Sequence, residues 1–246
     1  MDRLIYTAMT GARQTFKQQA GVAHNLANAS TVGYRAMEHR FRSVPVQGEA
    51  MPTRAFVVDA SVADVFEQGP LMATGRPLDV AVQGEGWIAV QGGNGEEAYT
   101  RAGNLHVDAN GLLQTVGGLN VLSDGGPIAI PPDNSITISP DGTVSVVPLF
   151  GTPNNVNDAG RIKLVNPPAT ELVRGDDGLF RMRDGQPALT DENVRLAPET
   201  LEGSNVNPVD SLVSLISLAR QFEMQIKLLQ SADSNAARAD QILSVT

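Results

Sequence analysis

The sequence predicts an α+β protein in which long N- and C-terminal helices pair as a coiled coil, with a mainly antiparallel β body inserted between them. Three observations support this prediction: apolar residues follow a helical period at both chain ends, the last segment lacks Gly and Pro, and short apolar runs alternate with turn pairs in the middle. The predicted divisions are an N-terminal helix over 1–33, an extended connector over 34–76, a β domain over 77–200 and a C-terminal helix over 201–246.

The C-terminal helix has the clearest signals. Asn207 has the side-chain oxygen that an N-cap needs, Pro208 suits the first helical position, and Asp210 favours the positive end of the helix dipole. Apolar residues then recur in the two core columns of a heptad repeat. These predicted packing residues are Leu212, Ala219 and Ile226 in one column and Leu215, Phe222, Leu229, Ala236 and Leu243 in the other.

The N-terminal segment has a matching pattern, in which apolar residues are spaced by three and four with one polar break at Gln19. Gly11 and Gly21 each weaken an isolated helix by about 1 kcal/mol relative to Ala, but small residues permit close approach of a neighbour. A long helix needs contacts along its length, so we expect the two ends to pack together and against other subunits. The alternative is that both helices dock on the globular body. The predicted packing residues here are Ile5, Met9, Ala12, Phe16, Ala23 and Leu26.

The middle of the chain predicts short β-strands from Pro77 to about Pro198. Leu78 to Val82 alternates with period two, and similar short runs follow it. The pairs between these runs tolerate the positive φ of tight hairpin turns. They include Asn94-Gly95, Asn110-Gly111, Asp124-Gly125, Asp141-Gly142 and Asp177-Gly178. The preceding segment contains several prolines and little regular period, which favours an extended connector.

Charge and cysteine usage exclude several function classes. The net charge is −9, and residues 46–200 carry twenty acidic against nine basic side chains, whereas residues 1–45 carry six basic against two acidic. An acidic body argues against nucleic-acid binding. The absence of cysteine excludes disulfides and thiol chemistry. No apolar run is long enough to span a bilayer, and the start lacks the apolar core of a secretory signal, so no cleaved signal peptide is expected.

Residues that would indicate catalysis, a cofactor or a metal site are not arranged in any known pattern. His24, His39 and His106 have no spacing typical of metal ligands, and no phosphate-binding loop or nucleophile motif is present. We therefore expect neither an enzyme nor a cofactor or metal. One alternative function is binding of cell-wall glycan by the β body, with Trp87 and Tyr99 as stacking platforms. The favoured interpretation of both aromatics is that they fill the β core.

Residues 23–35, AHNLANASTVGYR, resemble the signature A-N-N-L-A-N-x-x-T-x-G-[FY]-[KR] of bacterial flagellar rod and hook proteins, differing chiefly at His24. The matching positions are Asn25, Leu26, Ala27, Asn28, Thr31, Gly33 and Tyr34. Residues 69–81, 84–87, 99–104 and 141–143 resemble the β body of the same family. Residues 201–207, with Ser204, Asn205 and Val206, resemble its C-terminal motif. The resemblance covers essentially the whole chain.

Within this family the likeness is greatest to the proximal-rod members, and distal-rod or hook-type axial proteins are the alternatives. The segments that carry it are 1–9, 41–48, 174–178 and 220–224. The resemblance implies a structural subunit of the flagellar basal-body rod, in which terminal helices pair into an inner coiled coil and the β domain lies outside.

The resemblance also implies how such a subunit works. Family members assemble helically into a hollow drive shaft that transmits torque and lines the export channel. The implied partners are copies of the chain, other rod proteins including the distal-rod protein and, in transit, the flagellar type III export apparatus. The implied location is the rod where it crosses the periplasm, reached without a cleaved signal peptide.

Overall fold

The computed structural model describes residues 2–45, 55–149 and 156–243, and the chain divides into two compact units. Unit 1 is built from the stretches 1–29, 36–65 and 206–246. Unit 2 is built from the stretches 30–35 and 66–205. The two units are described separately below.

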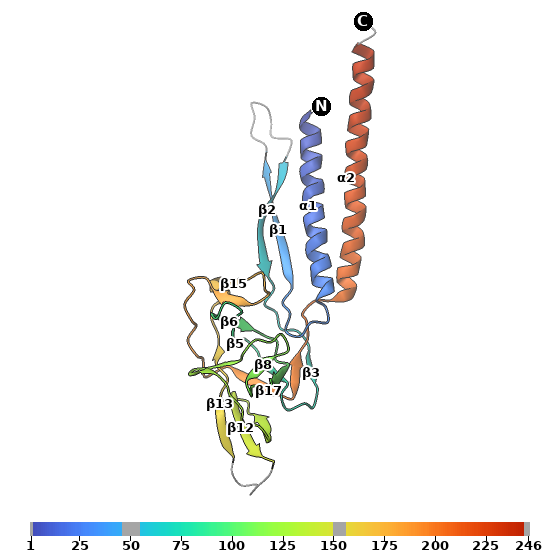
Figure 1. Ribbon diagram of the computed structural model, residues 1–246. Coiled ribbons are helices and arrows are strands. Elements are labelled where there is room, and N and C mark those ends of the chain that lie inside the picture. Colours follow the sequence, from blue (N-terminus) through green and yellow to red (C-terminus); the bar gives the residue numbers. More distant parts are fainter. Residues whose placement is uncertain (1, 46–54, 150–155, 244–246) are drawn as a thin grey trace. The chain divides into compact units, whose positions relative to one another are not determined.

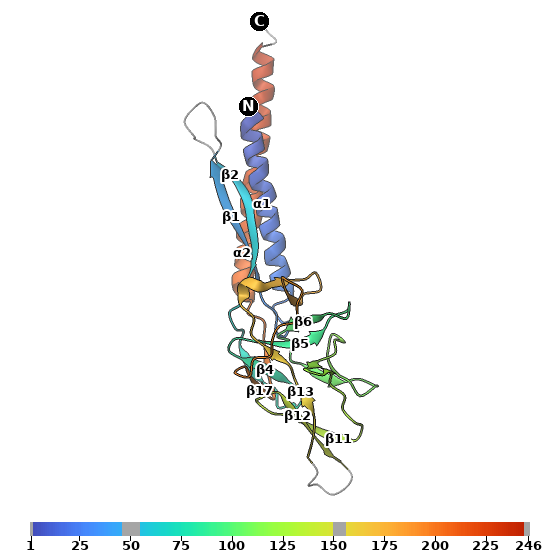
Figure 2. The same ribbon diagram turned by 90° about the vertical axis from the view of Figure 1, so that its left-hand side faces the viewer.

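Unit 1 contains two helices and a β-hairpin. Helix α1 (Asp2–Ala27) lies alongside helix α2 (Pro208–Leu243), and strands β1 (Met37–Pro45) and β2 (Ala55–Asp64) form an antiparallel pair beside α1 (Figure 1, Figure 2). Helix α2 begins as its sequence predicts: the Asn207 side-chain oxygen accepts hydrogen bonds from the Val209 and Asp210 N–H groups at 3.0 and 3.4 Å. Neither described helix is apolar enough over a sufficient length to cross a membrane.

The hairpin lies within residues 34–76, the range in which the sequence predicts an extended connector. Its strands were missed because the prolines nearby hide a pairing register that runs from Met37 opposite Asp64 to Pro45 opposite Ala55. The Asn25 side chain of α1 binds both backbone groups of Met37, donating to its carbonyl at 2.8 Å and accepting from its N–H at 3.0 Å. Residues of α1 therefore bond to the hairpin as well as facing α2.

The prediction of a long coiled coil between the two chain ends was wrong. The structure has two helices of unequal length, with 26 residues in α1 and 36 in α2, and much of the predicted seam is open. Met9, Phe16 and Leu212 are 55%, 61% and 49% exposed. The physical reason is that α1 also packs on the hairpin: a Cβ on Gly21 would lie 2.5 Å from the His39 ring, so this glycine serves close approach to β1.

Unit 2 is a β body whose paired strands are all antiparallel, as the sequence predicts. Its largest sheet has five strands in the order β14-β5-β6-β16-β15, and the next largest has three in the order β11-β12-β13. The five-stranded sheet consists of β5 (Trp87–Gln91), β6 (Glu97–Thr100), β14 (Leu164–Val165), β15 (Leu172–Arg174) and β16 (Phe180–Met182). The three-stranded sheet consists of β11 (Asn134–Ile138), β12 (Thr143–Pro148) and β13 (Asn157–Arg161).

The remaining strands of unit 2 form two-stranded ladders, and one short 3-10 helix, η1 (Ala169–Glu171), precedes β15. Two ladders join segments far apart in the chain: β3 (Leu71–Ala73) with β18 (Thr200–Glu202), and β4 (Val80–Gln83) with β17 (Arg195–Pro198). Two are local hairpins: β7 (Leu105–Val107) with β8 (Leu113–Thr115), and β9 (Leu122–Ser123) with β10 (Gly126–Pro127).

Two apolar clusters hold unit 2 together. The larger is aliphatic and includes the fully buried Val80, Ile88 and Leu113. The smaller is aromatic, with Trp87, Tyr99 and Phe180 at its centre. Full burial of a large apolar side chain stabilises a fold by about 1.5–3 kcal/mol, so these two clusters contribute strongly to the stability of unit 2.

Candidate assembly surfaces and the motif junction

Helix α2 has an inner face that packs on α1. The rings of Phe16 and Phe222 lie 6.4 Å apart between centroids, and the Thr15 hydroxyl donates to the Gln225 side-chain oxygen at 3.3 Å. A Cβ on Gly11 would meet the Gln225 amide at 3.3 Å, so this glycine permits the close approach of the two helices. The predicted residues on this face of α2 are half-buried, and they are Leu215, Ala219, Phe222, Ile226 and Leu229.

The other predicted packing residues differ in how far they are buried. On α1, Ala12 is buried, Leu26 is half-buried and Ala23 is exposed. The side chains of Ile5 and Leu243 lie outside the part of the chain that the structure describes. The structure thus covers the inner face of α2 more fully than it covers the predicted stripe of α1.

Helix α2 also has an outer apolar face that the heptad reading missed. Val209, Val213, Ile216 and Met224 are 65%, 63%, 52% and 63% exposed. Their spacings of four, three and eight residues bring them to one side of a helix with 3.6 residues per turn, opposite the inner face. Val213, Ile216, Ser217, Arg220, Gln221 and Met224 line an open groove there. The sequence signal was available, because the same spacing rule applied from Val209 finds this second stripe.

Helix α1 carries an open apolar stripe of its own. Tyr6, Met9 and Phe16 are 59%, 55% and 61% exposed and lie on one side of the helix, since their spacings of three and seven follow the helical repeat. Unit 1 therefore presents apolar surface on both helices. Contiguous exposed apolar surface in a soluble chain marks a site of interaction.

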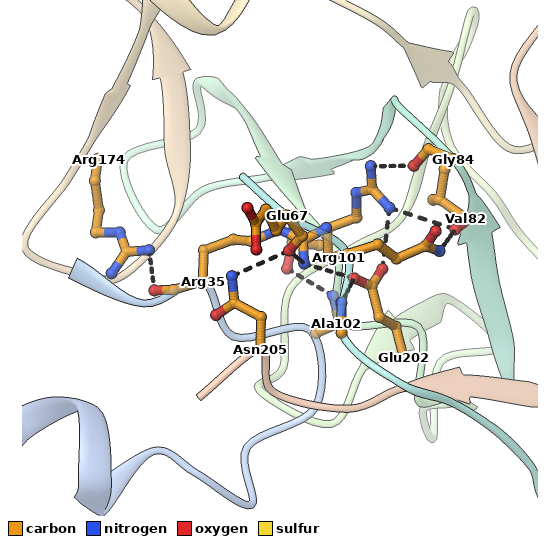
Figure 3. A network of polar contacts seen from close by, with 12 residues as sticks. Arg35, Glu67, Val82, Gly84, Arg101, Ala102, Arg174, Glu202 and Asn205 are labelled. Carbon is orange, nitrogen blue, oxygen red and sulfur yellow. Dashed lines mark hydrogen bonds and ion pairs between the residues drawn. The ribbon is translucent and has the colours of Figure 1, made fainter. Parts of the chain in front are cut away.

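A buried ionic junction occupies the side of unit 2 where the two family motifs meet (Figure 3). Glu202 is fully buried, and its two carboxylate oxygens pair with different arginines: Oε1 with Arg35 Nη1 at 2.6 Å, and Oε2 with Arg101 Nη1 at 3.0 Å. Oε1 also accepts a hydrogen bond from the Gly69 N–H at 3.0 Å. One carboxylate thereby joins three segments that are remote in sequence.

The arginines of this junction are also bound to backbone carbonyls. Arg35 Nη1 donates to the Glu67 carbonyl at 2.8 Å, and Arg101 Nη2 donates to the Gly84 carbonyl at 2.7 Å. Burial lowers the pKa of Arg101, and the negative charge of Glu202 opposes that shift. Both guanidinium groups stay charged, because an arginine does not lose its proton in proteins.

The junction holds two positive charges against one negative charge, and Trp87 helps to accommodate the surplus. The guanidinium carbons of Arg35 and Arg101 lie 6.0 and 5.4 Å from the centre of its ring. A cation over an aromatic face is attracted by the ring's electrons, and the attraction grows as water is excluded. Trp87 is 5% exposed, and its ring also packs on Phe180 at 4.6 Å between centroids.

The two family motifs are bonded to each other beside this junction. The Gly33 N–H donates to the Glu202 carbonyl at 2.8 Å, and the Asn205 N–H donates to the Tyr34 carbonyl at 3.3 Å. The Asn205 side chain donates to the Glu67 carbonyl at 3.0 Å. Ser204 is buried next to these bonds. The structure thus brings the unit 2 members of the two motifs together.

The remaining motif positions lie in helix α1, in the turn that follows it, or just before helix α2. Asn28 closes α1, since its side chain donates to the His24 carbonyl at 2.9 Å. Thr31 accepts a backbone hydrogen bond from Tyr34 at 3.3 Å, and Ala27 is exposed. Leu26 and Asn25 belong to α1, and Val206 is buried in the stretch before α2. These roles are capping and packing.

The aromatic pair considered for sugar stacking is part of the core. Trp87 and Tyr99 are 5% and 1% exposed, so neither has a ring face open to a ligand. The Tyr99 hydroxyl donates to Glu97 at 3.0 Å and accepts from the Ala188 N–H at 2.7 Å, and burial raises the pKa of Tyr99. The glycan-binding alternative therefore loses the residues on which it depended.

Groups that could ligate a metal do not gather in the described ranges of the chain. Within them, no three His, Cys, Asp or Glu side chains form a cluster that could hold an ion. His39 packs on α1 and stacks on Phe41, with 6.3 Å between ring centroids. Carboxylates at hairpin turns bond to their own loops: Thr143 donates to Asp141 through its hydroxyl at 2.8 Å, which lowers the pKa of that carboxyl.

Sequence reasoning did not identify the ionic junction, because its partners lie 101 residues apart for Arg101 and Glu202. A weak signal was present. Arg35, Arg101 and Glu202 all stand inside the stretches that carry the family resemblance, although the chemistry of those positions was not predicted.

Three family descriptions match this chain at its start, middle and end. Residues 5–35 match "Flagella basal body rod protein", residues 81–146 match "Flagellar hook protein FlgE/F/G D1 domain", and residues 197–242 match "Flagellar basal body rod FlgEFG protein C-terminal". The first and last of these include the two sequence motifs that meet at the junction.

Individual relatives match over the whole chain. The flagellar basal-body rod protein FlgF of Salmonella typhimurium is 45% identical, and that of Escherichia coli is 46% identical, in both cases over the full length of both chains. The flagellar basal-body rod protein FlgG of Agrobacterium fabrum is 31% identical over 96% of this chain and 97% of its own. These matches confirm the predicted rod-family resemblance, and the chain belongs to the flagellar basal-body rod protein family, as a structural rod subunit of the FlgF type.

Proposed function

We propose that this subunit is built into the proximal part of the rod and serves there mechanically, without catalytic activity. End-to-end identity of 45% and 46% to two FlgF proteins, against 31% to the FlgG relative, favours the proximal over the distal position. In this role many subunits stack helically into a hollow shaft that transmits torque and lines the export channel.

The observation that carries the mechanical role is the pair of opposite apolar faces on α2. Its inner face is occupied by α1 through Phe222, whereas its outer face, including Ile216 and Met224, has no cover within the described chain. Apolar surface gains about 25 cal/mol for each Å² removed from water, so covering this face favours association. The proposed covering partners are copies of this chain and other rod proteins.

The geometry of such contacts fits a shaft. The outer face of α2 and the open stripe of α1 are different surfaces, so a contact between one copy's α1 stripe and another copy's α2 face would be heterologous. A heterologous contact whose rotation does not close produces an open helical assembly instead of a ring. The predicted packing residues of both helices are proposed to act at these contacts between subunits.

The proposed location is the rod where it crosses the periplasm, with passage through the flagellar type III export apparatus on the way. The resemblance to rod proteins supports this route. The uneven charge of the chain is compatible with it, because the basic first 45 residues can meet acidic surfaces on neighbouring subunits.

Replacing Phe222 with aspartate tests the role of the helices. We expect Phe222→Asp to abolish rod assembly and motility in cells that depend on this chain, while residues 66–205 keep their fold. The reason is that a carboxylate in place of a half-buried ring loses the contact with Phe16 and is costly to bury again in an assembly. The measurements are swimming speed, electron microscopy of basal bodies and NMR spectra of the purified chain.

Glu223→Asp is the control, because Glu223 is the exposed neighbour of Phe222 and keeps its charge in that variant. It should assemble normally. Swimming at the normal rate by the Phe222→Asp strain would contradict the proposed function.

A further inference from the structure

Three stretches of unit 2 continue directly into unit 1 along the chain. They are 30–35, the stretch that begins at Phe66, and the stretch that ends at Asn205. All three contribute to the Glu202 junction: Arg35 from the first, Glu67 and Gly69 from the second, and Glu202 and Asn205 from the third (Figure 3). Force carried along the backbone from one unit to the other therefore passes through these stretches.

Hydrogen bonds and ion pairs link each of the three stretches to the other two. The Gly33 N–H donates to the Glu202 carbonyl at 2.8 Å, and the Gly69 N–H donates to the Glu202 carboxylate at 3.0 Å. The Gly203 N–H donates to the Pro70 carbonyl at 2.8 Å. The Glu67 carbonyl accepts from both Arg35 and Asn205. No stretch can leave without breaking bonds to the other two.

The backbone segments of the junction are closely packed, with no space for a side chain at two of its glycines. A Cβ on Gly33 would lie 2.3 Å from the Arg101 carbonyl carbon, and one on Gly69 would lie 2.1 Å from the Gly203 carbonyl oxygen. Backbone therefore touches backbone at two points of the junction. Arg101 then anchors the carboxylate to the β body through the carbonyls of Val82 and Gly84 at 3.3 and 2.7 Å.

We propose that Glu202 is a mechanical fastener, which makes the three stretches open and close as one cooperative element and shares load among them. The load-sharing part rests on the proposed function, whereas the cooperative opening is a property of the free chain. Without the fastener, each stretch would be pulled away singly, one hydrogen bond at a time. With it, all bonds of the junction must fail together.

Native-state hydrogen exchange on the full-length chain tests the cooperative opening. In the wild type, the amides of Gly33, Gly69, Gly203 and Asn205 should exchange through one shared opening. In Glu202→Gln, which removes the carboxylate charge that the two buried arginines share, all four should exchange at least 30-fold faster. The amide of Leu113, bonded to the Ile128 carbonyl in the aliphatic cluster, should keep its rate.

Glu67→Gln is the matched control, because it makes the same chemical change on an exposed side chain whose backbone belongs to the junction. It should leave all five rates unchanged. Glu202→Asp retains the charge and shortens the reach, so it provides a second variant if Glu202→Gln does not fold; the four junction amides should again accelerate together. Acceleration of Gly69 alone, or of Leu113 equally with the others, would overturn the cooperative fastener.

The load-sharing role has its own readout in cells. A strain with Glu202→Asp should swim normally in dilute medium and lose motility at high viscosity, where torque rises, whereas Glu67→Gln should swim in both. Equal motility of the two strains at high viscosity would overturn load sharing. Failure of the proposed function itself would instead appear as normal assembly by the Phe222→Asp strain.

Discussion

Replacing Ile216 and Met224 together with aspartate is expected to abolish incorporation into the rod while leaving the free chain folded. The two side chains are 52% and 63% exposed, so their loss removes little packing within one chain. The free energy of unfolding should fall by about 1 kcal/mol, mainly through the lower helix propensity of Asp. Assembly should be lost, because burying two unpaired carboxylates against an apolar neighbour costs several kcal/mol, and each 1.4 kcal/mol weakens association about tenfold.

Testing the double variant requires a measurement of its stability and a measurement of its assembly. Urea unfolding of the purified chain gives the first, and electron microscopy of basal bodies from the complemented strain gives the second. Ser214→Asp is the matched control, since Ser214 is exposed on the same part of α2, away from the outer apolar face. Rods formed at normal frequency by the double variant would show that the outer face stays uncovered in the assembly.

Replacing Gly33 with alanine is expected to destabilise unit 2 strongly, because this position combines a left-handed backbone with a close backbone contact. Gly33 has φ of 68°, and a Cβ there would lie 2.3 and 2.4 Å from the carbonyl carbon and oxygen of Arg101. The left-handed conformation costs a residue with a side chain about 1–2 kcal/mol. Displacement of two packed backbone segments adds to this, so we expect unit 2 to lose about 3 kcal/mol or more in urea unfolding.

A second glycine, Gly84, separates the cost of the left-handed conformation from the cost of the steric clash. Gly84 has φ of 70°, and no described atom lies within 4 Å of a Cβ built on it. Gly84→Ala should therefore cost only the conformational part, about 1–2 kcal/mol. If Gly33→Ala costs no more than Gly84→Ala, then the close approach between residue 33 and the Arg101 backbone is not a feature of the folded chain.

Local sequence signals predicted the elements that depend on neighbouring residues. The cap at Asn207 and the start of α2 follow from residue types within one helical turn. The hairpin turns follow from glycines that take positive φ, such as Gly111 at 80° and Gly142 at 88°. In each of these cases the chain itself supplies the interaction that the pattern requires.

Features that depend on distant residues were not predicted or were predicted wrongly. The coiled coil was wrong because the apolar period of α1 does not reveal that the β1–β2 hairpin takes part of its surface. The hairpin itself was missed, since its register depends on pairing between residues such as Met37 and Asp64. The Glu202 junction was missed because nothing in its local sequence distinguishes a buried carboxylate from a solvated one.

Labelling of a single cysteine at position 224 tests most directly the claim that the outer face of α2 is covered in the assembled rod. The chain has no cysteine of its own, so Met224→Cys gives one thiol at a site that is 63% exposed in the folded chain. We predict rapid reaction with a maleimide in the free chain and at least a tenfold slower reaction in purified rods. Equal reaction rates in the free chain and in the rod would contradict it.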